Sequence, residues 1–354
     1  MSDLDRLNVR GATAYPVSAA SARVRLANHV PFLAQHGVDL HYTPMLTTQE
    51  YATLISPTRA PVKAAVLAGS VLRTIGLHRS PGLLLVHRLL LMTPLPLADP
   101  PHALDVYDFD DALTVGSAAD ANRRFQWTKQ EARRAIAYMR RARLVIAANA
   151  MLAGEAGAYA RRVEVVPSCV DPERQPIHRH TNDEVLNVGW IGSHTTASYL
   201  QPLLPVIGQL RRRGLNVQLV VVGTDTGVRE DWIEHRPWTL ASQAADLASF
   251  DVGVMPLPDT AWTRGKSGYK LLQYFSAGVP AVASPVGINR DLLADGRGIA
   301  ATTALEWERA LTELLGDPAA RAQRGSGARR YVEEQFSYQR WASELAMLLR
   351  SIAS

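Results

Sequence analysis

The chain has 354 residues, which is more than one ordinary core holds and enough for two α/β domains. Hydrophobic residues make up 47% and charged residues 20%, a balance typical of globular proteins rather than of disordered or membrane-spanning chains. The single cysteine, Cys169, cannot form an internal disulfide, so we expect a fold that does not depend on an oxidising compartment.

No targeting segment is evident in the sequence. The first residues lack the apolar core of a signal peptide. The most apolar stretch, residues 83–98, is interrupted by His87, Arg88 and two prolines. It falls short of the roughly 20 apolar residues that span a bilayer. We therefore expect a cytoplasmic protein.

The formal net charge of +5 and the sequence pI of about 9.4 raise the question of an anionic partner. Much of the excess positive charge lies in residues 123–143, which we interpret as a basic amphipathic helix. A solvated helix face is the simplest interpretation, and contact with a membrane surface or an anionic partner is the alternative. Because no RNA-binding or helix-turn-helix signature is present, we expect no nucleic-acid partner. The sequence does not indicate an oligomeric state.

In the first half, short apolar runs alternate with longer helical patterns, which is typical of β-α-β units with a parallel sheet. The predicted strands are residues 7–14, 38–42, 83–87, 104–107, 144–147 and 163–166. The predicted helices are residues 20–35, 61–75, 120–141 and 151–159. Residues 172–184 are polar and lack periodicity, so they are predicted to be a linker.

The second half repeats this alternation. The predicted strands are residues 185–192, 217–222, 251–255, 279–284 and 298–301. The predicted helices are residues 197–213, 243–250, 267–277 and 304–315. Residues 318–352 are predicted to be almost wholly helical, with a break at Phe336 and Ser337. Because ligands of doubly wound sheets bind outside the carboxyl ends of the strands, we expect functional residues just after strands.

The strongest local feature is residues 264–280, Arg-Gly-Lys-Ser-Gly-Tyr-Lys-Leu-Leu-Gln-Tyr-Phe-Ser-Ala-Gly-Val-Pro. Ser267 is a suitable N-cap and Gly278 a suitable residue after the helix end. The first turn would place backbone N–H groups and a favourable dipole beside Lys266 and Lys270, which together predict a site for a diphosphate. A capped helix with a solvated lysine face explains the same residues equally well.

The segment Gly-Trp-Ile-Gly-Ser-His-Thr-Thr, residues 189–196, leads from a predicted strand into a predicted helix. Gly192 would let the backbone approach a ligand, and Ser193 and Thr195 could cap the helix or donate to a phosphate. A simple strand–helix turn explains the segment equally well. No G-x-G-x-x-G motif is present, which argues against a nicotinamide or flavin enzyme.

The order of motifs in the second half resembles the C-terminal domain of the retaining group-one (family-four) glycosyltransferases, which have the GT-B fold. The motifs are Val-Gly-Trp-Ile-Gly-Ser from residue 188, Val-Val-Val-Gly from residue 220, Asp-Leu-Ala-Ser-Phe-Asp-Val-Gly-Val-Met-Pro-Leu from residue 246, the segment 266–280, and Ser-Pro-Val-Gly from residue 284. The resemblance implies an α/β fold of two Rossmann-like domains facing across a cleft. We expect an acceptor-binding domain over residues 1–180, a donor-binding domain over residues 181–336, and a helix over residues 337–354 that packs back on the first domain.

In that family, the loop before the corresponding helix and its first turn hold the diphosphate and sugar of the donor. The resemblance therefore assigns donor binding to Arg264, Gly265, Lys266, Ser267, Gly268, Tyr269 and Lys270, together with Gly192, Ser193 and Thr195. Gln273 stands in place of the glutamate that holds the ribose, and Gly265 stands in place of another glutamate, which leaves the handling of the sugar open. The usual arginine after the first strand is missing, so Lys266 and Lys270 would carry more of the diphosphate charge.

The same resemblance places the nucleotide base near Gly223, Trp238, Thr239 and Leu240. Trp238 would stack on the base, although a half-buried packing residue is an equally good interpretation.

In the first half, Tyr-Asp-Phe-Asp-Asp-Ala, residues 107–112, follows a predicted strand. Like charges so close together require solvent, a cation, or a polyhydroxyl or amine ligand, and a solvated loop with one N-cap is the simple alternative. The run resembles an Asp-Phe-Asp-Asp motif in a bacterial branch of these transferases. The resulting assignment is catalysis by Asp110, Asp111, His87 and Lys266, and acceptor binding by Ser21, Arg23, Arg88 and Asp108. A satisfied histidine at the core edge and a solvated arginine are the alternatives for His87 and Arg23.

The sequence thus predicts a bacterial glycosyltransferase that moves a sugar from a nucleoside-diphosphate sugar, UDP-linked by family preference, to a hydroxyl acceptor with retention. The acceptor would be a small molecule or glycan of cell-envelope or natural-product synthesis. No cofactor or metal is expected, because GT-B enzymes generally need no bound metal. The alternatives are a GT-B epimerase or phosphorylase, and a non-catalytic nucleotide-sugar-binding protein.

Overall fold

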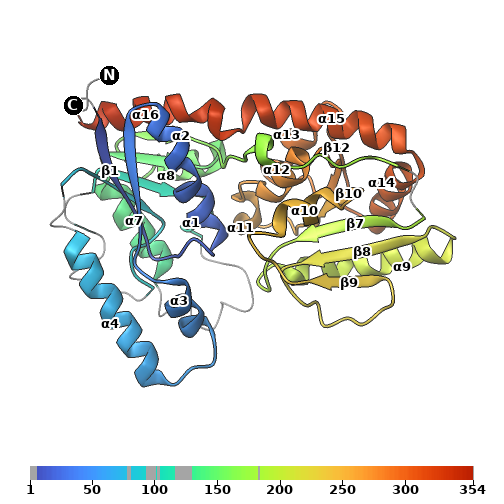
Figure 1. Cartoon of the computed structure of the whole chain (residues 1–354), viewed down its shortest axis with the longest axis horizontal. Helices are drawn as coiled ribbons and strands as arrows, with labels where there is room; N and C mark the ends of the chain where they lie inside the picture. Colours follow the sequence, from blue (N-terminus) through green and yellow to red (C-terminus); the bar gives the residue numbers. More distant parts are fainter. Residues whose placement is uncertain are drawn as a thin grey trace. The chain divides into compact units, whose positions relative to one another are not determined.

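The computed structural model describes residues 6–77, 81–92, 101, 104–115, 130–181 and 184–353. The described residues form two compact units (Figure 1). The first comprises residues up to Cys169 together with the C-terminal helix from Tyr338, and the second comprises Val170–Ser337. Each unit contains a six-stranded parallel sheet with helices packed on it, which confirms the predicted α/β fold with two Rossmann-like units.

The first sheet has the strand order β2-β1-β3-β4-β5-β6. Its strands are β1 (Leu7–Thr13), β2 (Val38–Pro44), β3 (Leu83–His87), β4 (Val106–Phe109), β5 (Leu144–Ala147) and β6 (Val163–Val165). The chain adds β2 on one side of β1 and then β3 on the other side. The switch point for ligands therefore lies between the carboxyl ends of β1 and β3.

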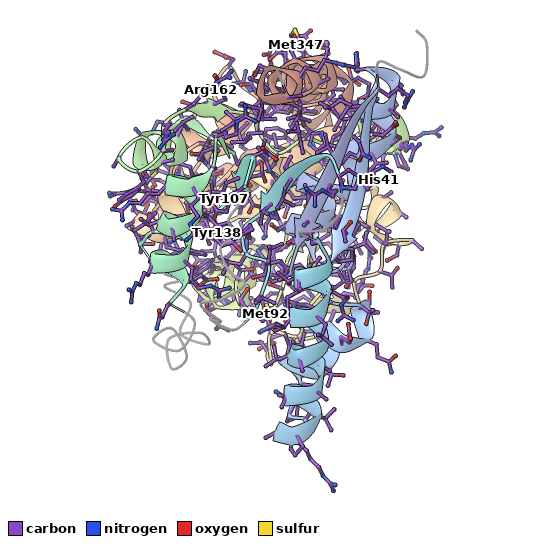
Figure 2. The ribbon with its side chains drawn as sticks, turned by 90° about the vertical axis from the view of Figure 1, so that its left-hand side faces the viewer. His41, Met92, Tyr107, Tyr138, Arg162 and Met347 are labelled. Carbon is purple, nitrogen blue, oxygen red and sulfur yellow. The ribbon has the colours of Figure 1, made fainter. Side chains whose placement is uncertain are left out.

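The helices of the first unit are α1 (Ala20–Arg25), η2 (Ala27–His29), α2 (Val30–Gln35), α3 (Thr48–Ile55), α4 (Ala60–Leu77), α7 (Glu131–Arg141), α8 (Ala150–Ala156) and α16 (Tyr338–Ala353). On one face of the sheet, Leu345 and Leu349 of α16 share a core with residues of β1 to β5. Tyr107 of β4 stacks on Tyr138 of α7, with ring centroids 5.1 Å apart (Figure 2).

The prediction of one helix over residues 20–35 is wrong, because the chain forms α1, the 3-10 turn η2 and α2 in succession. Leu26 ends α1 with a φ of −126°. Pro31 lies in the first turn of α2, where its missing N–H is tolerated, whereas it would clash inside a continuous helix. The prediction missed α3, although Thr47 and Glu50 form its capping box. Of the predicted helix 120–141, residues 120–129 lie outside the described residues.

His29 is buried, and its Nδ1 has no hydrogen-bond partner among the described residues. Burial and the nearby charge of Arg25 lower the pKa of His29 to about 3. The unfolded chain takes up this proton below about pH 6.5, whereas the folded chain does not until about pH 3. The stability of the fold should therefore fall as the pH drops below 6.5.

The unfolding free energy of the wild type should fall between pH 7 and pH 5. In the His29→Phe variant we expect this fall to be smaller by about 2 kcal/mol. Urea denaturation of both chains at the two pH values measures this difference. Parallel pH dependences of the two chains would contradict the assignment of a neutral, buried His29.

The second sheet has the strand order β12-β11-β10-β7-β8-β9. Its strands are β7 (Leu186–Ile191), β8 (Val217–Val222), β9 (Ile233–Arg236), β10 (Val252–Met255), β11 (Ala281–Ala283) and β12 (Gly298–Ala300). The chain runs from β7 to β8 and β9 on one side and then to β10 on the other side. The switch point of this sheet therefore lies between β7 and β10.

The helices of the second unit are η3 (Pro172–Arg174), η4 (Ala197–Leu203), α9 (Leu204–Arg212), α10 (Gln243–Ala248), α11 (Ala261–Arg264), α12 (Tyr269–Ser276), α13 (Asn289–Leu293), α14 (Ala304–Gly316) and α15 (Pro318–Gln335). The prediction of one α-helix over residues 197–213 is wrong. Pro202 lies in the 3-10 helix η4, and the α-helix begins only with Pro205 in its first turn.

The described part of the polar segment 172–184, which excludes residues 182 and 183, packs on the second unit. The Gln175 Nε2 atom donates to the Ala244 carbonyl at 2.8 Å. The His178 Nδ1 atom lies 2.8 Å from the Ala248 carbonyl oxygen, and the His180 Nε2 atom lies 2.9 Å from the Gly278 carbonyl oxygen.

One helix of the described chain, α4, is long and apolar enough to cross a membrane by length and composition alone. It has 18 residues and a mean hydropathy of 1.3. In the sequence, the most apolar stretch is a different one, residues 83–98. That stretch begins with β3, and residues 93–98 lie outside the described residues.

Candidate functional site

The residues predicted to bind the donor follow the carboxyl ends of four adjacent strands of the second sheet. Gly192 follows β7, Gly223 follows β8, Trp238 follows β9, and the segment 264–268 follows β10. Because these strands are parallel neighbours in the order β10-β7-β8-β9, the residues lie along one edge of the sheet. This is the edge at which doubly wound sheets bind ligands.

Gly192 and Gly223 allow two backbone segments to approach each other at this edge. The backbone of Gly223 has a φ of +96°, and a Cβ atom there would lie 2.4 Å from the Gly192 carbonyl oxygen. A Cβ atom at Gly192 would lie 2.4 Å from the ring of Trp190. Both glycines are therefore required by local packing. After Gly192, the Ser193 hydroxyl lies 2.8 Å from the Thr195 hydroxyl within an exposed turn.

The helix α12 begins at Tyr269, with Gly268 as its N-cap at a φ of +67°. The prediction that Ser267 caps this helix is wrong. A Cβ atom at Gly268 would lie 2.5 Å from Leu292, so packing against α13 selects glycine here. Gly278 follows the helix at a φ of +69°, which confirms its predicted place.

Lys266 and Lys270 do not share a helix face, because Lys266 precedes the first residue of α12. The Lys266 ammonium lies 5.2 Å from the centroid of the Trp262 ring, and the Lys270 ammonium lies 5.3 Å from that of Trp190. Both distances are within the range of cation–π contacts. Since Trp190 belongs to β7, its contact with Lys270 places this cation at the switch point between β7 and β10.

The remaining residues of the segment are engaged differently. The Arg264 guanidinium pairs with Asp259, with Nε 2.5 Å from Oδ1 and Nη2 3.1 Å from Oδ2. A Cβ atom at Gly287 would lie 2.2 Å from the Arg264 carbonyl oxygen, so the Ser-Pro-Val-Gly motif packs against the end of α11. Gln273 is 6% exposed on the inner side of α12.

Of the residues predicted to contact the base, Trp238 is half-buried against the core of the second unit. Its indole N–H donates to Gln243 Oε1 at 3.0 Å. The Thr239 hydroxyl accepts from the Ser242 N–H at 2.9 Å, and Leu240 is exposed. Trp238 thus has a packing role, and base stacking remains a prediction.

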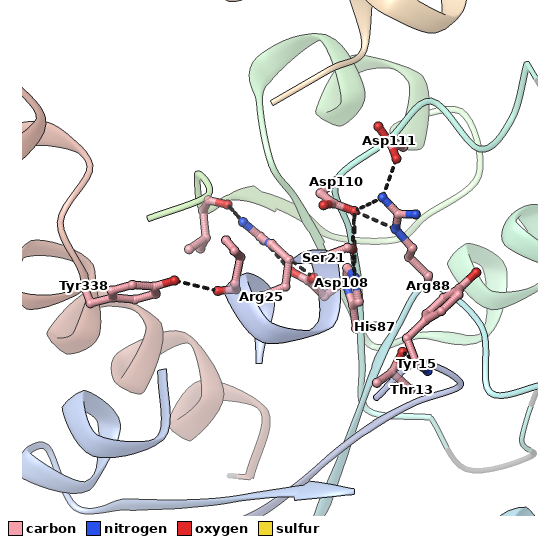
Figure 3. Close-up of polar contacts among 12 residues, drawn as sticks. Thr13, Tyr15, Ser21, Arg25, His87, Arg88, Asp108, Asp110, Asp111 and Tyr338 are labelled. Atoms are coloured by element: carbon pink, nitrogen blue, oxygen red, sulfur yellow. Dashed lines mark hydrogen bonds and ion pairs between the residues drawn. The ribbon is translucent and has the colours of Figure 1, made fainter. Parts of the chain in front are cut away.

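Residues of the first unit that were predicted to face the acceptor meet at the carboxyl ends of β1, β3 and β4 (Figure 3). The Ser21 Oγ atom, on the helix after β1, lies 2.5 Å from His87 Nε2 at the end of β3. The same hydroxyl lies 3.1 Å from Asp110 Oδ1, which follows β4. His87 Nδ1 lies 2.6 Å from Asp108 Oδ1. Ser21, His87, Asp108 and Asp110 therefore form one hydrogen-bonded chain.

Arg25 is the main ionic partner of Asp108, and the prediction of site residues did not include it. Its Nε donates to Asp108 Oδ1 at 3.1 Å, its Nη2 contacts Asp108 Oδ2, and its Nη1 donates to the Val166 carbonyl at 2.8 Å. Burial alone would raise the pKa of Asp108, but the charge of Arg25 and hydrogen bonds from His87 and Arg25 hold it below its usual value. The signal in the sequence is the spacing, since Arg25 lies one helical turn after Ser21.

Arg88 neutralises the other two carboxylates. Its Nε donates to Asp110 Oδ1 at 2.7 Å, and its Nη2 contacts Asp111 Oδ2. Burial would raise the pKa of Asp110, but the charges of Arg88 and Arg25 hold it well below its usual value. The three aspartates are thus compensated by two arginines rather than by solvent. Arg88 has a φ of +57°, a strained backbone conformation that persists only where its surroundings enforce it.

Arg23 is 4% exposed, and its Nη1 donates to the Val17 carbonyl at 2.9 Å. The alternative of a solvated arginine is therefore wrong. His87 is fully buried with a polar group facing each ring nitrogen, so the alternative of a satisfied histidine describes its surroundings correctly.

The hydrogen-bonded chain can hold one additional proton. The Ser21 hydroxyl has a single proton, which it can donate to His87 Nε2 or to Asp110 Oδ1. Donation to His87 requires a neutral imidazole with its proton on Nδ1, facing Asp108. Donation to Asp110 requires a second proton on His87 Nε2. This arrangement is suited to accept or release a proton beside a bound hydroxyl group.

The second unit can be assigned by comparison with known families. Residues 185–317 match the family model described as "Glycosyl transferases group 1". This segment is a glycosyltransferase group 1 domain. It contains every residue for which the sequence analysis proposed contact with the donor, from Gly192 to Gln273. No curated protein matches the chain by sequence similarity.

Several solved structures are similar to the chain over almost its whole length. Sucrose-phosphate synthase from Thermosynechococcus elongatus has a TM-score of 0.72 at 15% identity, covering 99% of this chain and 100% of that one. WaaG, a glycosyltransferase involved in lipopolysaccharide biosynthesis, has a TM-score of 0.62 at 16% identity, covering 96% and 99%. HepE from Anabaena, in complex with UDP and glucose, has a TM-score of 0.61 at 14% identity, covering 98% and 100%. At these identities the similarity shows the fold, which is GT-B-like.

Proposed function

We propose that the chain is a glycosyltransferase that transfers a sugar from a nucleoside-diphosphate sugar to a hydroxyl acceptor. The observation that carries this proposal is the glycosyltransferase group 1 domain, with Lys266 and Lys270 at the carboxyl edge of its sheet. The leaving group of such a donor is a diphosphate, whose charge must be stabilised as the glycosidic bond breaks. The two ammonium groups and the first turn of α12 would supply that stabilisation.

UDP is the nucleotide that we propose, which is supported by the similar fold of HepE, a protein solved with UDP. On the acceptor side, Ser21, His87 and Asp110 would orient the acceptor hydroxyl and hold the proton that it releases. We further propose that the enzyme retains the anomeric configuration, needs no metal, and acts in the cytoplasm of a bacterium in cell-envelope or natural-product synthesis. The involvement of WaaG in lipopolysaccharide biosynthesis supports the last point.

We expect Lys266→Ala to lower the affinity for UDP about tenfold to 100-fold, because a charge-assisted hydrogen bond to a phosphate is worth about 1.5–3 kcal/mol. The melting temperature should change little, because Lys266 is partly exposed in the loop before α12. Isothermal titration with UDP and GDP measures the affinities. Arg212→Ala is a matched control, because Arg212 is an exposed cation far from the proposed site. It ends α9 just before β8 begins, and so lies at the edge of the sheet opposite to Lys266.

The outcomes separate the alternatives. Failure of the wild-type chain to bind either nucleotide contradicts the proposal. Tight binding of UDP without hydrolysis or transfer of a UDP-linked sugar would instead identify a non-catalytic binding protein. Conversion of the donor sugar into its epimer without any acceptor would identify an epimerase. Release of UDP from the donor on addition of inorganic phosphate would identify a phosphorylase.

A further inference from the structure

The helix α4 of the first unit exposes large apolar side chains on its outer face. The residues that it buries are Ser70, Thr74 and Leu77, two of which are polar. Three of its large apolar side chains face outward, with Val62 46%, Leu72 70% and Ile75 43% exposed, whereas Val66, Leu67 and Val71 are partly buried. Only 17% of its apolar stretch is buried. A surface helix normally turns its apolar stripe toward the core, so this outward stripe indicates contact with something outside the chain.

Polar contacts help to hold α4 in this orientation. The Lys63 ammonium donates to the Leu54 carbonyl at 2.8 Å, and Arg73 Nε donates to the Met45 carbonyl at 2.8 Å. Arg73 also pairs with Glu50 of α3 at 2.8 Å. In Figures 1 and 2, α4 extends away from the sheet of the first unit. The apolar side chains therefore remain outward while the helix itself is anchored.

The charges around the apolar stripe are all positive or neutralised. Arg59 precedes α4, and Lys63 and Arg73 are its only charged residues. Glu50, the single carboxylate of α3, is paired with Arg73. An apolar helix face bordered by cations is complementary to a bilayer surface that carries anionic headgroups.

We propose that α4 binds the first unit to a membrane surface containing anionic lipids. The helix would lie in the plane of the interface with Val62, Leu72 and Ile75 below the headgroups. Its length of about 27 Å suits this position. A spanning orientation would require Lys63 and Arg73 to give up their contacts with α3 and with Met45. This surface differs from residues 123–143, and its binding does not depend on the chemistry of the donor site.

Vesicle flotation of the full chain tests the proposal. The vesicles are made of phosphatidylcholine alone, or of phosphatidylcholine with phosphatidylglycerol. We expect the chain to float only with the anionic vesicles, and the double variant Leu72→Glu with Ile75→Glu to bind them at least about tenfold more weakly. Arg59→Gln should weaken binding about fivefold, because one cation near an anionic surface contributes on the order of 1 kcal/mol.

The control is a double variant of exposed apolar residues elsewhere, Leu305→Glu with Met347→Glu, which are 54% and 63% exposed. This control should bind as the wild type does, and all variants should keep the wild-type melting temperature. No flotation of the wild type, or equal flotation with both vesicle types, overturns the proposal. Self-association that Leu72→Glu abolishes, without vesicle binding, would overturn it in favour of a second copy of the chain.

Discussion

Replacing Asp110 with asparagine should lower the rate of sugar transfer about 100-fold or more, while the affinity for UDP stays unchanged. The Asp110 carboxylate accepts hydrogen bonds from Ser21 and Arg88 at the carboxyl end of β4. The charge of Arg88 holds the pKa of this carboxyl well below its usual value despite burial, so the group is ionised at every pH at which the enzyme would work. Asparagine preserves the shape but removes the negative charge that faces Ser21 and Arg88.

The measurement is kcat and KM with a UDP-linked sugar, together with UDP affinity by titration calorimetry. Asp105→Asn is a suitable control, because Asp105 precedes the same strand and accepts the Leu84 N–H at 2.8 Å. It should leave kcat within about twofold of the wild type. Because Asp110 is in the first unit and the proposed donor residues are in the second, impaired UDP binding with normal turnover would overturn its assignment to the acceptor side.

The two sheets were predictable from the sequence because their strands are buried and therefore read as continuous apolar runs. Val217–Val222 illustrates this, since five of its six residues are buried. The edge strand β9 was missed for the opposite reason. All four of its residues are only partly buried, and Glu234 pairs with Arg236 along the strand. An edge strand needs no apolar pattern, so no periodicity signals it.

The start of α12 shows why the local geometry of the proposed donor site was less predictable. Serine is a good N-cap by propensity, which favours Ser267. The structure instead uses Gly268, whose positive φ and closeness to Leu292 depend on the packing of α13. Lys266 consequently lies in the loop before the helix rather than on a helix face with Lys270. The sequence indicated which residues gather at this edge but not how they are oriented.

The residues proposed to face the acceptor were predictable as a group because they lie at or after the carboxyl ends of β1, β3 and β4. The charge pairing within the group was not predictable. Asp108 pairs with Arg25, which lies 83 residues earlier in the chain, and the pairing depends on the order of β1, β3 and β4 in the sheet. From the sequence alone the three aspartates are expected to repel one another, whereas the fold pairs Asp108 with the buried Arg25, and Asp110 and Asp111 with the partly buried Arg88.

Removing the Asp108 carboxylate should have the largest effect on stability. Asp108→Ala leaves the Arg25 guanidinium, whose side chain is 1% exposed, without its counter-ion inside the first unit. Breaking a buried ion pair by removing one partner costs about 3–5 kcal/mol, because the remaining charge is desolvated and unpaired. Urea denaturation followed by circular dichroism measures this cost. The double variant Arg25→Met with Asp108→Ala should recover part of it, because the unpaired charge is then absent as well.

The Arg6–Asp39 pair of the same unit provides a matched control, since both of its side chains are 37% exposed. An exposed pair contributes only about 0.2–1 kcal/mol, so Asp39→Ala should be mild. A cost for Asp108→Ala no larger than that for Asp39→Ala would show that water reaches Arg25. It would then also reach His87, which shares the Asp108 carboxylate, and the closed hydrogen-bonded chain that leads to Ser21 would not exist in solution.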